Sequence, residues 1–187
     1  MAVRILGGTH RSRVLKTPAG QDTRPTRSLV REAIFNILQG EVEGAHVLDL
    51  FAGSGAMGFE AVSRGARHAV FCDSAAAAVR TVKENARLLK AEAKTTVLHH
   101  NWAQALAQLG ARQQEFHLIF LDPPYKMETE PILSGIAQAG LLAVDGWIVL
   151  EQSTDQAPHI PQPLTLDKTR RYGQTSLYFI TKGREEA

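Results

Sequence analysis

Short apolar runs alternate with segments of helical periodicity from about residue 46 to residue 152. The runs have the length and composition of buried strands, and between them apolar residues recur every three or four positions. The predicted strands cover residues 46–51, 68–73, 95–100, 116–121 and 147–152, and the predicted helices cover 56–64, 74–90, 102–109 and 129–139. Strands that alternate with helices predict an α/β fold with a parallel sheet and helices on both faces.

The C-terminal part of the chain departs from this alternation. Residues 164–173 and 175–182 predict two strands with no helix between them, so these two should be antiparallel. In parallel sheets of this kind, ligands bind beyond the carboxyl ends of the strands. The chemistry should therefore lie just after residues 51, 73, 100 and 121.

The N-terminal part differs in structure and in charge. Residues 4–8 and 13–17 predict a short hairpin, and a helix with one apolar stripe follows, up to Gly40. Arg27 and Arg31 fall off that stripe, so they can face solvent or a ligand. Residues 1–31 carry a net charge of +6, whereas the rest of the chain carries −4. This asymmetry fits either a polyanionic partner or a solvated basic arm without one.

Composition narrows the class of protein. The 187 residues suggest one domain, and the single cysteine, Cys72, excludes an internal disulfide framework. Cys72 lies in a predicted strand, where a small core residue is the expected role. The start of the chain shows no apolar leader and no run has the length of a membrane span, so we expect a cytoplasmic protein.

A glycine-rich loop follows the first parallel strand. Gly53, Gly55 and Gly58 match G-x-G-x-x-G between a strand and a helix, which is typical of adenosine-containing cofactors, although a tight turn without a ligand is an alternative. Asp73, twenty residues after Gly53, ends the second strand and could accept from both ribose hydroxyls. Asp49 would repel a pyrophosphate but suits the ammonium of a methionine moiety. It therefore favours S-adenosylmethionine over NAD.

Asn101 and Trp102 follow the third strand. An amide can pair with an adenine edge and an indole can flank the ring, although Trp102 could equally be a core residue at the start of a helix. His99 and His100 are adjacent in a strand and point to opposite faces, so we read them as structural rather than as a metal pair.

The fourth strand ends in Asp122, Pro123, Pro124 and Tyr125. The prolines stiffen the loop and leave its carbonyl groups as acceptors without competing N–H donors. Acceptors beside a stacking ring suit a planar amino group, which two hydrogen bonds would orient toward a methyl–sulfonium. Such a transfer needs no metal, and Asp122 could take the proton that the methylated amine loses. The alternative is a plain turn, which Asp-Pro often starts.

These residues resemble a known family. "LDLFAGSGAMG" (48–58), Asp73 and "DPPY" (122–125) are similar to class I S-adenosylmethionine-dependent amino-methyltransferases. "RILGGTHRSRVL" (4–15) and "RPTRSLVREAIFNIL" (24–38) resemble the bacterial 16S rRNA guanine-N2 methyltransferases of the RsmD type. The resemblance implies a Rossmann-like fold with a seven-stranded, mostly parallel sheet whose last strand is antiparallel, plus a small N-terminal hairpin and helix.

The resemblance also implies an activity, methylation of one guanine N2 amine in 16S rRNA, within an assembled or assembling 30S particle. By the same resemblance Gly53, Ser54 and Gly55 would line the methionine end of the cofactor. Asp73 would hold the ribose, although the family more often has Glu there, and Asn101 would approach the adenine. The residues that would hold the target base are Asp122, Pro123 and Tyr125.

We expect residues 1–40 to form an RNA-facing extension and residues 41–187 to form the methyltransferase domain of a monomer. The candidate phosphate contacts are Arg4, Arg11, Arg13, Arg24 and Arg27. The same acceptor geometry would serve a DNA adenine or a protein glutamine amide, but the chain leaves no room for a separate DNA-recognition domain. A non-catalytic RNA-binding factor on this fold is a further alternative, and an NAD dehydrogenase a more distant one.

Overall fold

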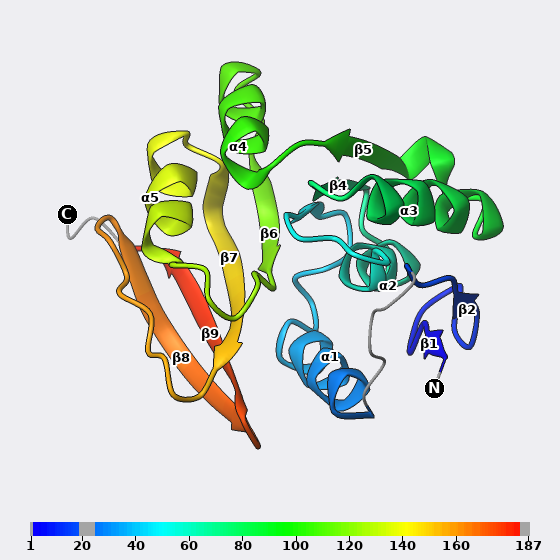
Figure 1. Ribbon diagram of the computed structural model, residues 1–187, viewed down its shortest axis with the longest axis horizontal. Coiled ribbons are helices and arrows are strands. Elements are labelled where there is room, and N and C mark those ends of the chain that lie inside the picture. The colour runs from blue at the N-terminus through cyan, green and yellow to red at the C-terminus, as the bar shows by residue number, and fades with distance from the viewer. Residues whose placement is uncertain (1, 19–24, 184–187) are drawn as a thin grey trace.

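The computed structural model describes residues 2–18 and 25–183, and of residues 25–27 it describes only the backbone (Figure 1). A two-stranded hairpin, β1 (Val3–Arg4) with β2 (Val14–Leu15), precedes helix α1 (Pro25–Ile37). Each hairpin strand is shorter than predicted, because the chain between them is taken up by turns. Within the described ranges, no helix is long and apolar enough to cross a membrane.

The remaining strands form one seven-stranded sheet, in the order β5-β4-β3-β6-β7-β9-β8. Only β9 runs against the others, and it pairs antiparallel with both β7 and β8. The seven strands are β3 (His46–Asp49), β4 (His68–Asp73), β5 (Thr95–His99), β6 (Phe116–Leu121), β7 (Leu142–Ser153), β8 (Leu164–Tyr172) and β9 (Thr175–Lys182). The mostly parallel sheet with its last strand antiparallel is therefore confirmed.

Helices cover both faces of this sheet (Figure 1). Alternate residues of β3 serve the two sides, since Val47 packs in one core cluster and Leu48 in the other. One cluster takes apolar residues from α1, α2, α3 and the hairpin, and the other takes them from α4 and α5. The helices after α1 are α2 (Ala56–Ser63), α3 (Ala76–Leu88), the 3-10 turn η1 (Glu92–Lys94), α4 (Trp102–Ala111) and α5 (Glu130–Gln138).

Strand β7 begins five residues earlier than predicted, at Leu142 instead of residue 147. Its pairing with β6 shifts between Leu142 and Trp147, so the intervening residues form an irregularity within the strand. Asp145 there has a φ of 60° and precedes Gly146, a pair of residues that is typical of a turn. Asp145 and Gly146 do turn the backbone, but they form a bulge within β7 and do not end the strand.

The packing of the core shows the roles of Cys72 and of the N-terminal hairpin. Cys72 is only 1% exposed, packs in the α4–α5 cluster, and burial raises its pKa to about 12, so it is a core residue. Ile5 and Leu15 of the hairpin pack in the same cluster as Val47, which joins the N-terminal segment to the sheet. The division of the chain at residue 40 stays a prediction.

Candidate active site

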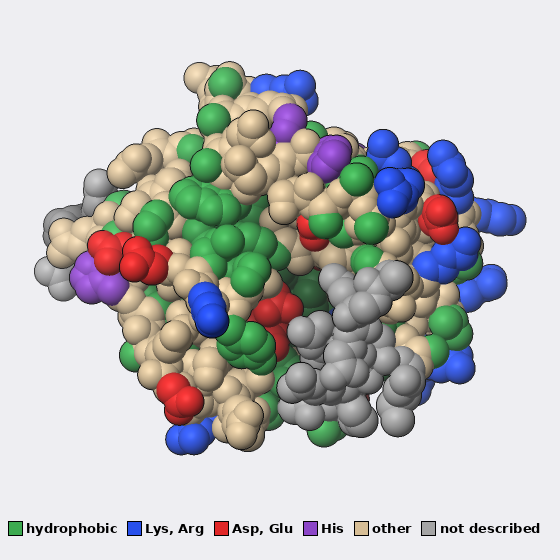
Figure 2. All heavy atoms as spheres, in the orientation of Figure 1, with side chains coloured by type: hydrophobic (Ala, Val, Ile, Leu, Met, Phe, Trp, Pro, Cys, Tyr) green, Lys and Arg blue, Asp and Glu red, His purple; other side chains and the backbone are tan. Residues whose placement is uncertain are grey.

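A cavity of about 760 Å³ opens at the carboxyl ends of β3, β4, β6 and β7. It spans the point between β3 and β6 where the strand order reverses, as expected for this class of sheet. Figure 2 shows a hollow in the centre of this face, with acidic side chains beside it. The cavity brings together nearly all of the predicted cofactor and catalytic residues: Asp49, Gly53, Ser54, Asp73, Asn101, Trp102, Asp122, Pro123, Pro124 and Tyr125.

The glycine turn is shaped by Asp73 from the neighbouring strand. One carboxylate oxygen of Asp73 accepts from the Gly53 N–H at 2.9 Å, and the other accepts from the Ala75 N–H at 2.9 Å. Gly53 has a positive φ of 54°, which an L side chain rarely adopts. Because each carboxylate oxygen has a second lone pair, these bonds leave Asp73 able to accept from ribose hydroxyls as well.

Gly55 shapes the turn from behind instead of lining the cavity. It also has a positive φ, and a Cβ built on it would lie 2.7 Å from the Phe59 ring. The bare backbone at Gly55 therefore lets α2 start close against the aromatic core.

Asp49 is buried beside the turn and is 3% exposed. Its Oδ2 accepts from the Gly58 N–H at 3.1 Å. Desolvation raises its pKa to about 7, and the charges of Asp122 and Asp73 act in the same direction, against the Gly58 bond. A buried carboxyl whose pKa lies near 7 would stabilise a cationic group beside it, because the cation offsets the cost of burying the negative charge.

Asn101 caps helix α4. Its Oδ1 accepts from the Gln104 N–H at 2.9 Å, and the Gln104 side chain accepts from the Asn101 N–H at 3.2 Å. Because the cap uses the carbonyl oxygen, a contact of this side chain with adenine would come from its NH₂ donors. Trp102 lines the cavity and also packs against the α4–α5 cluster, so its position in the core leaves the role beside the adenine as a prediction.

Asp122 directly follows strand β6, and Glu151 lies within the neighbouring strand β7, two residues before its end. Leu121 of β6 pairs with Leu150 of β7, so the residues that follow them stand side by side at the rim, and both line the cavity. Tyr125 is 63% exposed, and the Met127 N–H donates to the Pro124 carbonyl at 2.8 Å, which closes the loop as a turn. The expectation that the carbonyl groups of this loop have no competing N–H donor is therefore wrong for Pro124, because the chain turns back two residues beyond the prolines. Residues 122–125, which we call the proline lip, and the glycine turn thus meet in one cavity.

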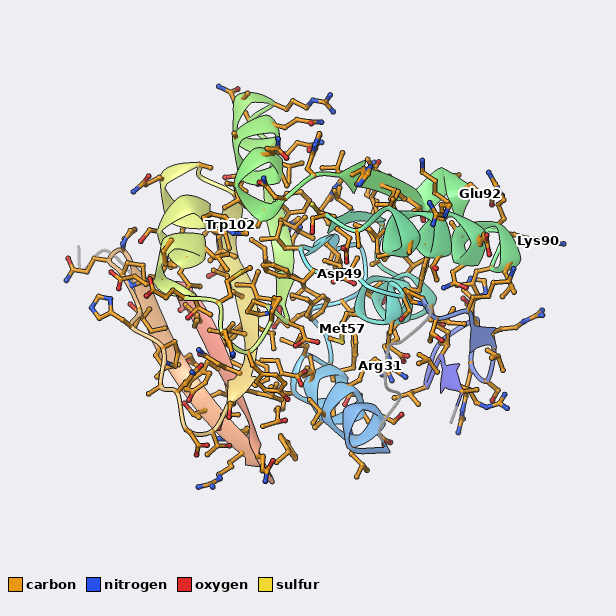
Figure 3. The ribbon with its side chains drawn as sticks, in the orientation of Figure 1. Arg31, Asp49, Met57, Lys90, Glu92 and Trp102 are labelled. Carbon is orange, nitrogen blue, oxygen red and sulfur yellow. The ribbon has the colours of Figure 1, made fainter. Side chains whose placement is uncertain are left out.

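The sequence did not point to Glu151 or to the role of Arg31. Arg31 is 6% exposed and lines the cavity, so it does not face solvent. Its guanidinium donates to the Arg4 carbonyl and lies 3.7 Å from a carboxylate oxygen of Glu60. Burial lowers the Arg31 pKa, and the charge of Glu60 opposes that shift. Figure 3 labels Arg31 on α1, Asp49 at the end of β3 and Met57 on α2, all near the centre of the view.

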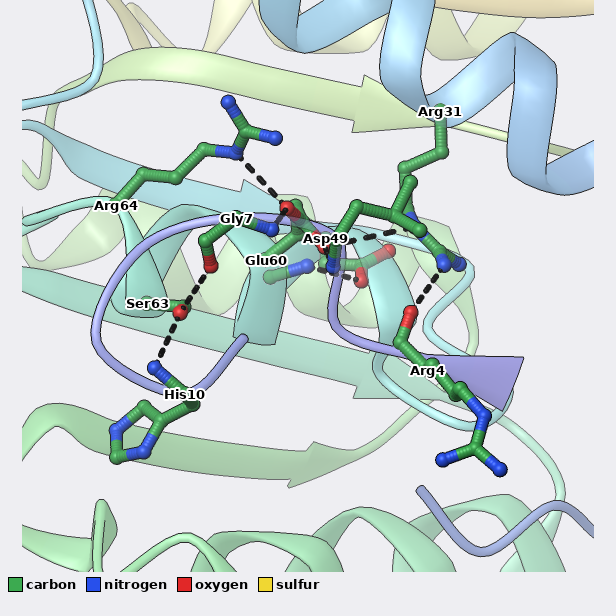
Figure 4. Close-up of polar contacts among 10 residues, drawn as sticks. Arg4, Gly7, His10, Arg31, Asp49, Glu60, Ser63 and Arg64 are labelled. Atoms are coloured by element: carbon green, nitrogen blue, oxygen red, sulfur yellow. Dashed lines mark hydrogen bonds and ion pairs between the residues drawn. The ribbon is translucent and has the colours of Figure 1, made fainter. Parts of the chain in front are cut away.

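Glu60 anchors the N-terminal hairpin to helix α2 (Figure 4). This carboxylate is fully buried and accepts from the Leu6 and Gly7 N–H groups and from Arg64, each at 2.8 Å. Ser63 adds a bond to the Gly7 carbonyl at 2.6 Å. Because α2 starts at the glycine turn, the hairpin is attached to the same element that shapes the cofactor site.

Asn85 links the hairpin directly to the glycine turn. Its side chain is fully buried, accepts from the Lys16 N–H at 2.9 Å and donates to the carbonyls of Lys16 and Ser54 at 3.0 and 2.9 Å. No local pattern marks a residue with this role, since its partners lie 69 and 31 positions away.

Three of the five arginines predicted to contact RNA are exposed on the hairpin, namely Arg4, Arg11 and Arg13. Arg24 lies outside the described residues, and for Arg27 only the backbone is described. His99 and His100 bond different partners, Ser74 and Gln108. Across residues 2–18 and 25–183, no three His, Cys, Asp or Glu side chains are grouped as a metal site would need.

Known proteins identify the family. A model described as "Conserved hypothetical protein 95", the RsmD family, matches residues 3–181. The chain belongs to this family and is an RsmD-like methyltransferase. Ribosomal RNA small subunit methyltransferase D of Escherichia coli K12 is 34% identical over 176 residues, 93% of this chain and 87% of that relative.

Solved structures also resemble this chain. A hypothetical protein of Thermus thermophilus is 33% identical with a TM-score of 0.82, over 96% of this chain and 99% of that one. SMU.776, solved in complex with SAH, is 14% identical with a TM-score of 0.69, over 84% of this chain and 50% of that one, which shows the fold alone. The cofactor of this RsmD-like methyltransferase is S-adenosylmethionine, which confirms the choice over NAD.

Proposed function

We propose that this chain transfers the methyl group of S-adenosylmethionine to the exocyclic N2 amine of one guanine in 16S rRNA of the small ribosomal subunit. The E. coli relative that covers most of the chain is named as a methyltransferase of small-subunit rRNA. The observation that carries the choice of acceptor is the pair of carboxylates, Asp122 after β6 and Glu151 in the adjacent strand β7, which both line the cofactor cavity.

The pair fits the Watson–Crick edge of guanine. Guanine presents two adjacent donors there, the N1–H and the N2 amine, and each can be accepted by one carboxylate. Adenine carries an acceptor at N1, which would face a carboxylate with no proton between them. Specificity of this kind is strong because the wrong base leaves polar groups unpaired. We assign the N2 amine to Asp122 and the N1–H to Glu151.

The reaction is a direct displacement. The N2 lone pair attacks the methyl carbon, the new N–C bond forms as the C–S bond breaks, and the sulfur leaves with its electron pair as uncharged S-adenosylhomocysteine. The methylated nitrogen then carries a positive charge and loses a proton to Asp122. The Asp122 carboxylate and the carbonyl groups of the proline loop orient the amine, and Tyr125 stacks on the base, so positioning supplies most of the rate enhancement.

The lining residues could hold S-adenosylmethionine in the following way. Gly53 and Ser54 would line its methionine end with Asp49 beside the ammonium, Asp73 would accept from the ribose hydroxyls, and Asn101 and Trp102 would lie by the adenine. The sulfonium would then face the proline loop. S-Adenosylmethionine supplies the electrophilic methyl group, and the chain supplies orientation and charge.

The substrate is part of a large RNA. A guanine within a helix must be unstacked, or lie in a loop, to reach the sulfonium. Residues 1–40 form the RNA-facing extension of a monomeric enzyme that acts on a 30S particle or on an assembly intermediate, with the hairpin arginines at the phosphates.

Mass mapping of modified guanines tests the function. 30S subunits from cells that lack the gene are incubated with labelled S-adenosylmethionine and the protein, and 16S rRNA is digested and sequenced by fragmentation. We expect one labelled N2-methylguanine, and none with the Asp122→Ala variant. Label in DNA or protein instead of 16S rRNA would refute the proposal, as would a methyl group at N1 of the guanine.

A further inference from the structure

The exposed face of helix α3 carries a line of cations that the predicted RNA contacts do not include. Arg80, Lys83 and Arg87 are spaced by three and four residues, so they lie on one face of the helix, and Lys90 continues the line just past its end. All four are exposed, while Val79, Val82 and Ala86 on the other side of α3 are buried. We call these four residues the α3 ridge.

The ridge and the hairpin form one surface. Lys16 of the hairpin pairs with Glu84 of α3 at 2.9 Å, and Asn85 bonds the Lys16 backbone. The neighbour of Lys16, Thr17, lines the cofactor cavity. A continuous path therefore leads from the cavity over the hairpin to the ridge. Figure 2 shows Lys and Arg gathered over α3 and the hairpin, in the same view as the central hollow, and Figure 3 shows Lys90 at the outer end of α3.

Interactions within the protein explain this charge only in part. Among the described residues, none of the ridge cations lies within ion-pair distance of an acid, and Glu84, the one acid on α3, pairs with Lys16. The charges of Arg87 and Arg80 also lower the pKa of Glu84, after the larger effect of Lys16, whereas Lys83 and Lys90 have no such role. The helix dipole accounts for Arg87 in the last turn, but it does not reach Arg80 and Lys83, which lie in the middle of the helix. The stability of α3 therefore gives no reason for the whole line.

We propose that the α3 ridge is a docking surface for the sugar–phosphate backbone of the substrate RNA. From Arg80 to Arg87 the ridge extends for about 10 Å along the helix, at about 1.5 Å per residue, and Lys90 follows just past the helix end, so the ridge can contact successive phosphates of one strand. Such contacts carry no base sequence and fix how the RNA lies on the enzyme. The inference rests on the proposed function, because it takes the substrate to be RNA, and it adds the direction in which that RNA leaves the cavity.

Two matched variants test the ridge. Arg80→Gln/Arg87→Gln removes two exposed cations from the ridge, and Arg170→Gln/Arg171→Gln removes two exposed arginines from β8, at the far edge of the sheet. Both lower the net charge by the same amount, so a general effect of charge is equal in the two. Binding to transcribed 16S rRNA is measured over a series of salt concentrations, together with melting temperature and affinity for S-adenosylmethionine.

We expect the ridge variant to bind the RNA about tenfold more weakly near 0.1 M salt, with a salt slope shallower by about 1.4 to 1.8 for two lost phosphate contacts. The KM for RNA should rise while kcat, cofactor affinity and melting temperature stay at the wild-type values. The β8 variant should bind within twofold of wild type.

Equal behaviour of the two variants would overturn the inference, as would an unchanged salt slope. A loss seen on 30S particles but not on transcribed rRNA would also overturn it, since a ribosomal protein would then be the partner of the ridge. If wild-type enzyme methylates 16S rRNA while the ridge variant binds normally, only the ridge assignment fails. If wild-type enzyme leaves 16S rRNA unmethylated, the proposed function itself fails.

Discussion

The acids at the ends of β3 and β4 differ in their surroundings from Asp122, which follows β6, and Glu151, which lies in β7. Asp49 and Asp73 accept hydrogen bonds from backbone N–H groups of the glycine turn and of the helices that follow it. Asp122 is an exposed residue of a stiff loop, and Glu151 stands beside it at the rim. The first pair lies inside the framework of the turn, whereas the second lies where a base would enter.

This difference separates two uses of the same chemical group. On the cofactor side, carboxylates hold a backbone shape, and Glu60 extends that pattern to the hairpin. On the proposed base side, the carboxylates of Asp122 and Glu151 lie after and within strands whose positions are already fixed by the sheet. Mutations on the first side should therefore act mainly on stability and cofactor affinity, and those on the second mainly on turnover.

The largest expected effect is that of Glu60→Ala. This variant leaves the Arg31 and Arg64 charges without their buried partner and the Leu6 and Gly7 N–H groups without an acceptor, which should lower the free energy of unfolding by about 3–5 kcal/mol. Urea unfolding measures this loss. Glu84→Ala, which removes the exposed pair with Lys16, is the control and should change stability little. Equal losses in the two variants would contradict the role of Glu60.

Asp122→Ala should lower turnover and leave stability and cofactor affinity unchanged. We expect kcat to fall about 10²–10³-fold, the usual effect of removing one hydrogen-bonding group that orients a transition state. Cofactor affinity by calorimetry and the urea midpoint should stay at the wild-type values. Glu128→Ala, an exposed acid on the same loop, is the control. Undiminished turnover of the Asp122 variant would rule out the assigned role.

Asn85→Ala should have an intermediate effect on both stability and cofactor binding, because the Asn85 side chain joins the hairpin to the glycine turn. Loss of three hydrogen bonds at a buried site should cost about 1–3 kcal/mol of unfolding free energy and weaken cofactor binding. Thr81→Ala on the same helix, whose hydroxyl bonds only the Ala77 carbonyl, should cost less and leave cofactor affinity unchanged. The Asn85 link would be disproved by normal cofactor binding together with normal stability.

The smallest effect is a dependence on pH through Asp49. Its pKa is raised to about 7 in the cofactor-free protein, while an unfolded aspartate titrates near 4. Between these values the folded chain holds the proton more tightly, so its free energy of unfolding falls as the pH rises through that window. The cofactor ammonium favours the ionised carboxylate of Asp49. The affinity of the protein for S-adenosylmethionine should therefore rise about tenfold from pH 6 to pH 8.

Asp49→Asn supplies the control for this pH dependence. Because an amide does not titrate in this range, we expect the variant's cofactor affinity to be flat between pH 6 and pH 8. Calorimetric titration at several pH values measures both proteins. The same slope in both would assign the pH dependence to another group.

Much of the fold could be predicted from the sequence because burial repeats locally. The apolar run at residues 116–121 marks a strand covered on both faces, and β6 occupies that range. The glycine turn, Asp73 and the double proline were also predictable, since each belongs to a strand end and parallel strands gather their carboxyl ends at one edge. Their meeting in a single cavity follows from that geometry.

The amino-acid sequence by itself determined the order of elements, the class of cofactor loop and the candidate lip. Tertiary structure decided what Arg31, Glu60 and Asn85 do, and that the signal at Asp145 is a bulge. Glu60 meets the hairpin across 53 and 54 positions of the chain, and Asn85 meets Lys16 across 69. A local pattern reports which side of an element is buried, but the partner of a buried polar group is set by how distant elements pack.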